Sequence, residues 1–321
     1  MTLFQPPFAA ALAAGERILI AGAGGGFDIL CGLPLYFDLL ARGKRVFLAN
    51  LTFSDLQVAP DGWLTPSLLR VTPAIEVLEQ FYFPELYLAR WLAENGDANP
   101  AVFAFARSGV RPLIANYQRL IDDLQLDTIV LVDGGTDSLM RGDEDGLGTP
   151  FEDLASLAAV AALPVARKLL VCLGFGVDHY HGVSNDLSLA AIAELTRTGC
   201  FLGSASLLSS MAGVEQYRAA AGYIFAAMPQ SASIVNSSIL TALNGGYGDI
   251  HVTARTRGST LWINPLMPIY WFFDLQGVAE RCRLLTSSLY ATEHFSEVRE
   301  AIALRHRGGN KTVRRRGTIP S

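Results

Sequence analysis

A glycine-rich turn near the amino terminus has the residue types needed to bind an anion. It follows the apolar run Ile18–Ala21 and precedes an apolar helical pattern. Its residues of interest are Gly22, Gly24, Gly25, Gly26 and Asp28. Because glycine has no side chain, backbone N–H groups in such a turn can approach a ligand closely, and the N-terminus of the following helix favours negative charge. The turn therefore predicts a site for a phosphate or carboxylate group.

The turn fits neither of two common nucleotide-binding signatures. The dinucleotide fingerprint requires a third glycine, but Phe27 occupies that position. Asn50 stands at the end of the next apolar run, where an acidic residue would hold a ribose hydroxyl group. The Walker motif is excluded because no lysine followed by serine or threonine comes after the glycines. We expect a general anion site that includes Asn50, with a tight turn that binds nothing as the alternative.

A second glycine-flanked turn is acidic. Its residues are Asp133, Gly134, Gly135, Thr136 and Asp137, and further carboxylates follow at Asp143, Glu144, Asp145, Glu152 and Asp153. Carboxylates that lie close together could hold a hard cation such as Mg²⁺ or Ca²⁺ through oxygen. Alternatively, Asp133 and Asp137 could bind hydroxyl or amino groups of a substrate while the other carboxylates are solvated.

The acidic stretch ends in the signature of a helix start. We expect Thr149 as the N-cap, Pro150 as the first helical residue and Glu152 at the third position. This pattern predicts a capping role for Glu152 rather than a catalytic one.

A third glycine-flanked turn contains residues suited to proton transfer. Asp178, His179 and His181 lie within four residues, shortly after Gly174 and Gly176, which we expect to shape a ligand-binding loop. An imidazole that titrates near neutral pH beside a carboxylate can act as a general acid or base, and the pair could also hold a transition metal. In an extended loop the two histidines would point to opposite sides, so at most one would face a common centre.

Each of these turns, and Asn50, follows an apolar run typical of a buried strand. The runs are Arg17–Ala21, Arg45–Leu51, Thr128–Val132 and Lys168–Leu173. Helical patterns lie at Ile29–Ala41, Leu113–Leu124, Leu154–Ala161 and Leu187–Thr198. Continuous apolar strands that alternate with helices indicate an α/β fold with a doubly wound, mainly parallel, Rossmann-like sheet. The turns would then meet at the carboxyl edge of that sheet.

Three further segments complete the expected single α/β domain over residues 1–321. Residues 52–116 are rich in aromatic side chains and predict a helical insertion that packs on the fold or covers a pocket as a lid. The C-terminal third predicts helical additions at Val214–Ala227, Ser233–Leu243, Leu275–Ser287 and Glu293–Leu304, with short strands at Leu261–Ile263 and Ile269–Phe273. Residues 305–321 predict a basic, solvated tail, with closure over an anionic ligand or binding to a neighbouring subunit as alternatives.

Composition narrows the classes of partner. Half of the 321 residues are hydrophobic, which is enough for a large core. The net charge of −5 gives no reason to expect nucleic acid as a partner, and no apolar run is long enough to span a bilayer. The four cysteines lack the spacing of a zinc or redox motif, and no basic leader precedes the apolar N-terminal residues. We expect a cytoplasmic protein without membrane contact, and a homo-oligomer is compatible with the sequence.

The segment Ile20–Asp28, the helix entry after it and the loop at residues 133–137 resemble a family of prokaryotic proteins known as domain of unknown function 1152. That resemblance implies no activity. From the residues we expect an enzyme that acts on a small anionic metabolite, a nucleotide or phosphorylated compound, by hydrolase, transferase or lyase chemistry. The alternative is a non-catalytic regulatory protein that binds a nucleotide or metabolite. A divalent cation and a nucleotide are the two cofactors that these residues would suit.

Overall fold

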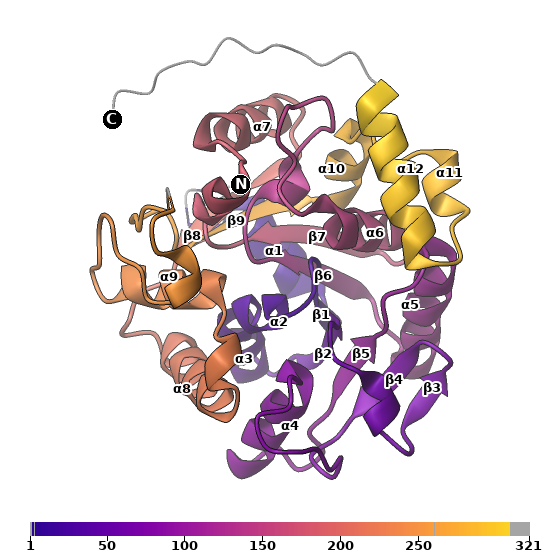
Figure 1. Cartoon of the computed structure of the whole chain (residues 1–321), viewed down its shortest axis with the longest axis vertical. Coiled ribbons are helices and arrows are strands. Elements are labelled where there is room, and N and C mark those ends of the chain that lie inside the picture. Colours follow the sequence, from indigo (N-terminus) through magenta and orange to yellow (C-terminus); the bar gives the residue numbers. More distant parts are fainter. Residues whose placement is uncertain (1, 3, 260, 309–321) are drawn as a thin grey trace.

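A nine-stranded sheet runs through the chain in the order β3-β4-β5-β2-β1-β6-β7-β9-β8 (Figure 1). The computed structural model describes residue 2, residues 4–259 and residues 261–308. The strands are β1 (Arg17–Gly22), β2 (Arg45–Leu51), β3 (Trp63–Thr65), β4 (Leu68–Val71), β5 (Val102–Phe105), β6 (Thr128–Asp133), β7 (Arg167–Cys172), β8 (Phe201–Ser206) and β9 (Ile269–Asp274). The helices are α1 (Pro7–Ala14), α2 (Asp28–Cys31), α3 (Leu33–Ala41), α4 (Pro84–Glu94), α5 (Val110–Leu124), α6 (Pro150–Ala161), α7 (Asn185–Arg197), α8 (Ala212–Ala227), α9 (Ile234–Leu243), α10 (Leu275–Arg281), α11 (Ser287–Tyr290) and α12 (Phe295–Gly308).

The centre of the sheet is parallel, which confirms the predicted doubly wound fold. Strands β5, β2, β1, β6 and β7 run in one direction, while β3, β4, β8 and β9 join by antiparallel pairing. From β1 the chain first extends the sheet through β2 and then returns to place β6 on the other side of β1. This reversal creates a switch point between β1 and β6, and ligands of open α/β sheets bind outside the carboxyl ends of the strands at such a point.

The two faces of the sheet are buried by different helices. In β1, Ile18 and Ile20 pack into one hydrophobic core, and Leu19 and Ala21 pack into the other, because successive side chains of a strand point to opposite faces. Helices α3, α4 and α8 contribute to the first core, and α5, α6 and α10 contribute to the second (Figure 1). Burial on both faces explains why the central strands have continuous apolar sequences.

The helix expected at Ile29–Ala41 is divided into α2 and α3. The break falls at Gly32, two residues before Pro34. Proline lacks a backbone N–H group, so Pro34 cannot continue the hydrogen bonds of α2 and instead fits the first turn of α3. A Cβ atom at Gly32 would lie 2.6 Å from Cγ2 of Ile20, so this glycine also lets the helix approach the central strand closely.

The segment at residues 52–116 is helical only in part. It contains α4, but also β3, β4 and β5, and β5 extends the parallel sheet beside β2. Most of its aromatic side chains are core residues, including Phe83, Trp91 and Phe105. The segment is therefore largely a part of the sheet and its packing rather than a separate insertion.

The C-terminal third also differs in detail from the expectation. Around Leu261–Ile263 only an isolated bridge forms, between Ile263 and Gly248, whereas Ile269–Asp274 is the strand β9. The expected helix Leu275–Ser287 ends at Arg281, and α11 begins at Ser287. Arg305 and Arg307 of the expected basic tail belong to α12, and residues 309–321 lie outside the described residues. No helix in the described part of the chain is long and apolar enough to cross a membrane.

Candidate functional site

Three carboxylates meet at the switch point. Asp28 begins α2 directly after the glycine turn of β1, Asp133 is the last residue of β6, and Asp153 lies in the first turn of α6. One carboxylate oxygen from each residue lies within 4.8 Å of those of the other two. The sequence predicted Asp28 and Asp133 as ligand-binding residues and gave Asp153 no role of its own.

Two more aspartates, Asp137 and Asp178, belong to the same group. We call the five residues together the acidic cage: Asp28, Asp133, Asp137, Asp153 and Asp178. Burial raises the pKa of Asp153 and of Asp178 well above its ordinary value, and the negative charge of Asp137 raises both further. The side chains of the cage residues other than Asp28 are only 2–7% exposed. The structure therefore brings the acidic turn, the glycine turn and Asp178 together, as the parallel sheet predicted.

Burial and mutual repulsion dominate the electrostatics of the cage. Burial is the largest influence on Asp28 and raises the pKa of its carboxyl group to about 7, while a hydrogen bond from Gly24 opposes that shift. For Asp133, burial and the charges of Asp137 and Asp178 all raise the pKa. No lysine or arginine in the described ranges forms an ion pair with a cage aspartate. The protein thus keeps a net excess of acid in a buried place.

Backbone N–H and hydroxyl donors orient the two cage carboxylates at the carboxyl ends of the central strands β1 and β6, those of Asp28 and Asp133. The Gly24 N–H group donates to Oδ2 of Asp28 at 2.7 Å. The Ser138 N–H and hydroxyl groups both donate to Oδ2 of Asp133. The N–H group of Gly24, which the sequence suggested for an external anion, is therefore directed at the carboxylate of Asp28.

Asp137 and Asp178 are fixed in the same way. The Thr149 N–H group donates to Oδ2 of Asp137 at 2.9 Å, and the Thr136 N–H group donates to Oδ2 of Asp178 at 2.5 Å. Thr149 precedes α6 and Pro150 is its first residue, as expected, but the Thr149 side chain makes no capping hydrogen bond within the helix. Its N–H and hydroxyl groups serve Asp137 instead.

Asp153 differs from the other members because part of its carboxylate has no partner. Its Oδ1 atom is fully buried and accepts no hydrogen bond from a described residue. A Cβ atom at Gly24 would lie 2.8 Å from this oxygen and 2.9 Å from Oδ2 of Asp28, so the two carboxylates face the same glycine.

The glycines of the two turns make room for carboxylates. A Cβ atom at Gly134 would lie 2.6 Å from Oδ1 of Asp28, closer than real Cβ contacts allow. Gly135 lies against the carboxylate of Asp178 in a similar way. Gly25 and Gly26 have φ angles of 84° and 62°, which favour glycine, and the ring of Phe53 covers both.

Asn50 links the glycine turn to helix α4 through two hydrogen bonds. Its Nδ2 atom donates to the Gly26 carbonyl at 2.8 Å and to Oε1 of Glu85 at 2.7 Å. Glu85 is fully buried, and burial raises its pKa to about 7. Sequence reasoning missed Glu85, although a glutamate directly before the apolar run Leu86–Ala89 was a signal.

The third predicted turn divides its residues between the cage and the solvent. Val177–His181 forms a short 3₁₀ helix rather than an extended loop. His179 and His181 are both exposed, and a positive charge on His181 lowers the pKa of Asp137, which burial raises. The electrostatic influence of a histidine that was expected on Asp178 is therefore exerted by His181 on Asp137.

The glycines of that turn have structural surroundings. The N–H group of Gly174 donates to the Met267 carbonyl at 3.0 Å. Gly176 lies beside the side chains of Asn185 and Asn264. Both glycines have φ near +90°, at 100° and 89° respectively, which a residue with a side chain adopts rarely.

Two exposed arginines, Arg107 and Arg299, act electrostatically on Glu152, and we call them the arginine rim. Burial raises the pKa of Glu152, and the charges of Arg107 and Arg299 lower it. Glu152 also raises the pKa of Asp28 and of Asp153, so its charge acts on the cage and is itself influenced by the rim. The site therefore changes from acidic inside to basic outside.

Aromatic rings support both arginines. The Arg107 guanidinium group lies 5.3 Å from the ring centre of Phe53 and 5.7 Å from that of Phe295, and the Arg299 group lies 5.5 Å from that of Phe151. The Phe53 side chain is 42% exposed.

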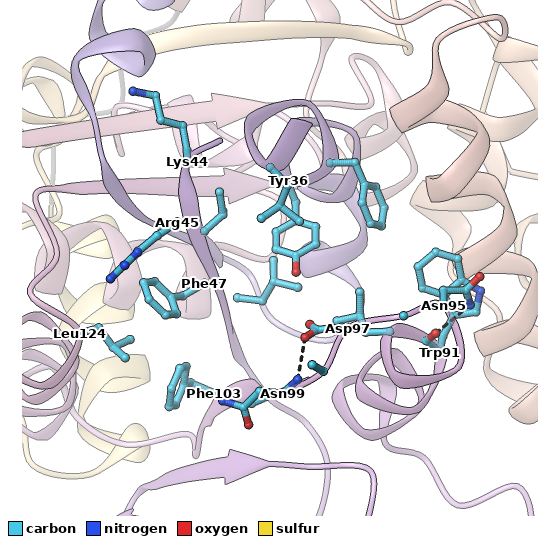
Figure 2. Close-up of a pocket in the computed structure, with 18 of the residues that line it drawn as sticks. Tyr36, Lys44, Arg45, Phe47, Trp91, Asn95, Asp97, Asn99, Phe103 and Leu124 are labelled. Carbon is cyan, nitrogen blue, oxygen red and sulfur yellow. Dashed lines mark hydrogen bonds between the residues drawn. The ribbon is translucent and has the colours of Figure 1, made fainter. Parts of the chain in front are cut away.

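A separate cavity in the described part of the chain lies away from the cage. It has a volume of about 810 Å³ and is lined by the first residues of β2 and by the connection from α4 to β5. Figure 2 shows the Tyr36 hydroxyl group pointing towards Asp97, with Arg45 and Phe47 on the neighbouring wall. None of the predicted site residues lines it, so the cage and this cavity are at opposite edges of the sheet.

A protein-family model matches the part of the chain that contains most of these elements. Residues 88–308 match the model of a family described as protein of unknown function (DUF1152), which is more than half of the chain. The matched part contains four of the cage aspartates, and Asp28 lies outside it. No curated protein and no solved structure matches the sequence. The chain therefore belongs to the DUF1152 family.

Proposed function

We propose that this chain is an enzyme that acts on a small phosphorylated metabolite, such as a nucleotide, at the carboxyl edge of its sheet. The observation that carries this proposal is the acidic cage at the switch point. Burying like charges together lowers the stability of a fold. Groups with strongly shifted pKa values concentrate at functional sites, which favours a catalytic purpose for this costly arrangement.

The arginine rim supports an anionic substrate. Guanidinium groups bind phosphate oxygens through paired, charge-assisted hydrogen bonds. Arg107 and Arg299 come from different elements yet both act on Glu152 beside the cage. Phe53 is 42% exposed and lies next to Arg107 and the glycine turn, where the base of a nucleotide could pack against its ring.

The proposed chemistry uses the cage and the histidine at its edge. The carboxylates orient the reacting groups, and His181 exchanges a proton with the substrate or with water while Asp137 holds a charge beside it. Hydrolysis, group transfer and elimination are all compatible with these roles.

A turnover screen tests the proposal. The full-length protein is incubated with nucleoside phosphates and sugar phosphates in the presence of Mg²⁺ and Mn²⁺, and products are followed by phosphorus NMR. We expect conversion of at least one compound. In an Asp137→Asn variant we expect the rate of that conversion to fall by about 100-fold or more. Asp123→Asn is the matched control, because Asp123 is a partly exposed carboxylate on α5 that pairs with Arg119. A compound that stabilises the protein but is never converted would overturn the enzymatic proposal in favour of a binding protein.

A further inference from the structure

We infer that Asp28, Asp133 and Asp153 together bind one divalent cation of the hard class, such as Mg²⁺, Mn²⁺ or Ca²⁺. This inference deepens the proposed function, and its catalytic meaning rests on it, but cation binding itself can be tested separately.

The spacing of the three carboxylates suits one ion. Their ligand oxygens lie within 4.8 Å of one another. Oxygens coordinate Ca²⁺ at about 2.4 Å and Mg²⁺ at about 2.1 Å, so two ligands on opposite sides of an ion are roughly 4.2–4.8 Å apart. The observed span therefore accommodates a coordinated ion with at most small movements of the side chains.

The unpartnered oxygen of Asp153 is a separate indication of a ligand. The Asp153 side chain is 3% exposed, and its Oδ1 atom has neither a hydrogen-bond donor among the described residues nor solvent contact. Burying a charged oxygen without a hydrogen-bond partner or a counter-ion destabilises the folded state by several kcal/mol. This oxygen faces Gly24 and the carboxylate of Asp28, which is the place where an ion shared with Asp28 and Asp133 would lie.

The donor set favours hard cations over soft ones. All three ligand atoms are carboxylate oxygens. Cys172 is nearby, with its Sγ atom 3.8 Å from Oδ2 of Asp133, but no thiol belongs to the group of mutually close ligand atoms. Oxygen donors of this kind select Mg²⁺, Mn²⁺ and Ca²⁺ rather than copper or zinc.

A cation also resolves a conflict in the proposed function. A phosphate would be repelled by the acidic cage if only the arginine rim attracted it. An ion held by three carboxylates can share its open positions with phosphate oxygens, as metal ions do in many phosphoryl-transfer sites. The cage would then bind the ion, and the ion and the rim would bind the phosphate.

The experiment uses the full chain, freed of metal with EDTA and titrated with Mn²⁺ while the free ion is followed by electron paramagnetic resonance. We expect one Mn²⁺ per chain, displaced by Mg²⁺ or Ca²⁺, and binding weakened about 100-fold or more in an Asp153→Asn variant. The Asp123→Asn control is expected to bind Mn²⁺ like the unaltered protein. Because the substitution removes a buried charge, metal-free Asp153→Asn protein is expected to melt at the same temperature as the unaltered protein or higher.

Several results would overturn the inference. It fails if Mn²⁺ does not bind at concentrations up to about 10 mM, or if a folded Asp153→Asn variant binds it as tightly as the unaltered protein. If Asp153→Asn does not fold, Asp28→Asn provides the same test from the partly exposed side of the cage. Turnover that persists in EDTA, together with the absence of Mn²⁺ binding, refutes the cation and leaves the proposed enzyme standing. Mn²⁺ binding without turnover of any phosphorylated compound refutes the enzyme and leaves the cation site standing.

Discussion

At the scale of single residues, Glu85 is a buried acid whose surroundings can be tested apart from the cage. Its carboxylate accepts hydrogen bonds from Asn50 at 2.7 Å and from the Ser54 hydroxyl group at 3.4 Å. These donors lower its pKa, but burial outweighs them and raises it from 4.5 to about 7. Glu85 therefore supports Asn50 and the glycine turn at a cost that depends on pH.

A Glu85→Gln variant measures that cost. Below pH 4.5 the carboxyl group is protonated in both folded and unfolded chains, so it adds no difference between them. As pH rises through the ordinary value towards 7, the unfolded chain ionises first and the folded protein loses stability, by roughly 3 kcal/mol for a shift of this size. Urea titrations give the free energy of unfolding of Glu85→Gln and of the unaltered protein. We expect the variant to gain stability relative to the unaltered protein between pH 5 and pH 8, by roughly the same 3 kcal/mol. An equal difference at both pH values would contradict the assignment.

Sequence reasoning at this scale found the members of the cage that stand near strand ends. Asp133 and Asp178 were predictable because acidic residues beside glycine follow apolar runs. Asp153 was not, because it lies one helical turn inside α6, and only the folding of α6 back over the sheet brings it to Asp28. The role of Asn50 was equally hidden, since its partner Glu85 comes from a helix that the sequence did not resolve.

At the scale of elements, the glycine turns determine how closely the carboxylates approach. Gly134 follows β6 directly, and the space beside its Cα atom is occupied by Oδ1 of Asp28 and Sγ of Cys31. A side chain there would push the start of α2 away from the end of β6.

A Gly134→Ala variant is expected to lose roughly 1–3 kcal/mol of stability, as overpacked buried sites do, and to lose Mn²⁺ affinity. Thermal unfolding and the Mn²⁺ titration measure the two effects. The matched control is Gly222→Ala on the exposed side of α8, where a Cβ atom meets nothing within 4 Å. There alanine is expected to stabilise the helix by about 0.5–1 kcal/mol. Equal behaviour of the two variants would show that Gly134 is not needed for close approach.

The elements that sequence patterns identified are the long, buried ones. Strands β1, β2, β6 and β7 are continuously apolar because helices cover both faces, so their sequences alone were sufficient. Strands β3, β4 and β5 have only three or four residues each and lie within an aromatic segment, so no period was visible. Strand β8 was missed because its residues Gly203, Ser204 and Ser206 are typical of a loop, and pairing with β9 decides its conformation.

At the scale of the whole molecule, the family match and the fold have different boundaries. The match begins at residue 88, after β1 and β2. In the sheet, β1 lies between β2 and β6, and five pairs of residues join it to β6. The matched part alone therefore lacks the central strand and Asp28.

A fragment of residues 88–308 is expected not to fold. Without β1 and β2, the strand β5 has no parallel neighbour to connect it with β6, and the core around Ile18 and Leu19 is lost. Circular dichroism and dispersed NMR spectra compare the fragment with the full chain. A cooperative unfolding transition in the fragment would contradict this expectation and indicate that residues 1–87 are an accessory part.

The arrangement of the three ligands has a consequence for the lifetime of the folded state. Asp28 and Asp153 come from segments that are remote in the sequence and lie on either side of Asp133. An ion coordinated by Asp28, Asp133 and Asp153 would act as a removable cross-link. Its bonds to the protein must break before the two halves of the sheet separate. Chelation would then accelerate spontaneous opening of the protein, so metal supply would govern how long each molecule survives proteolysis.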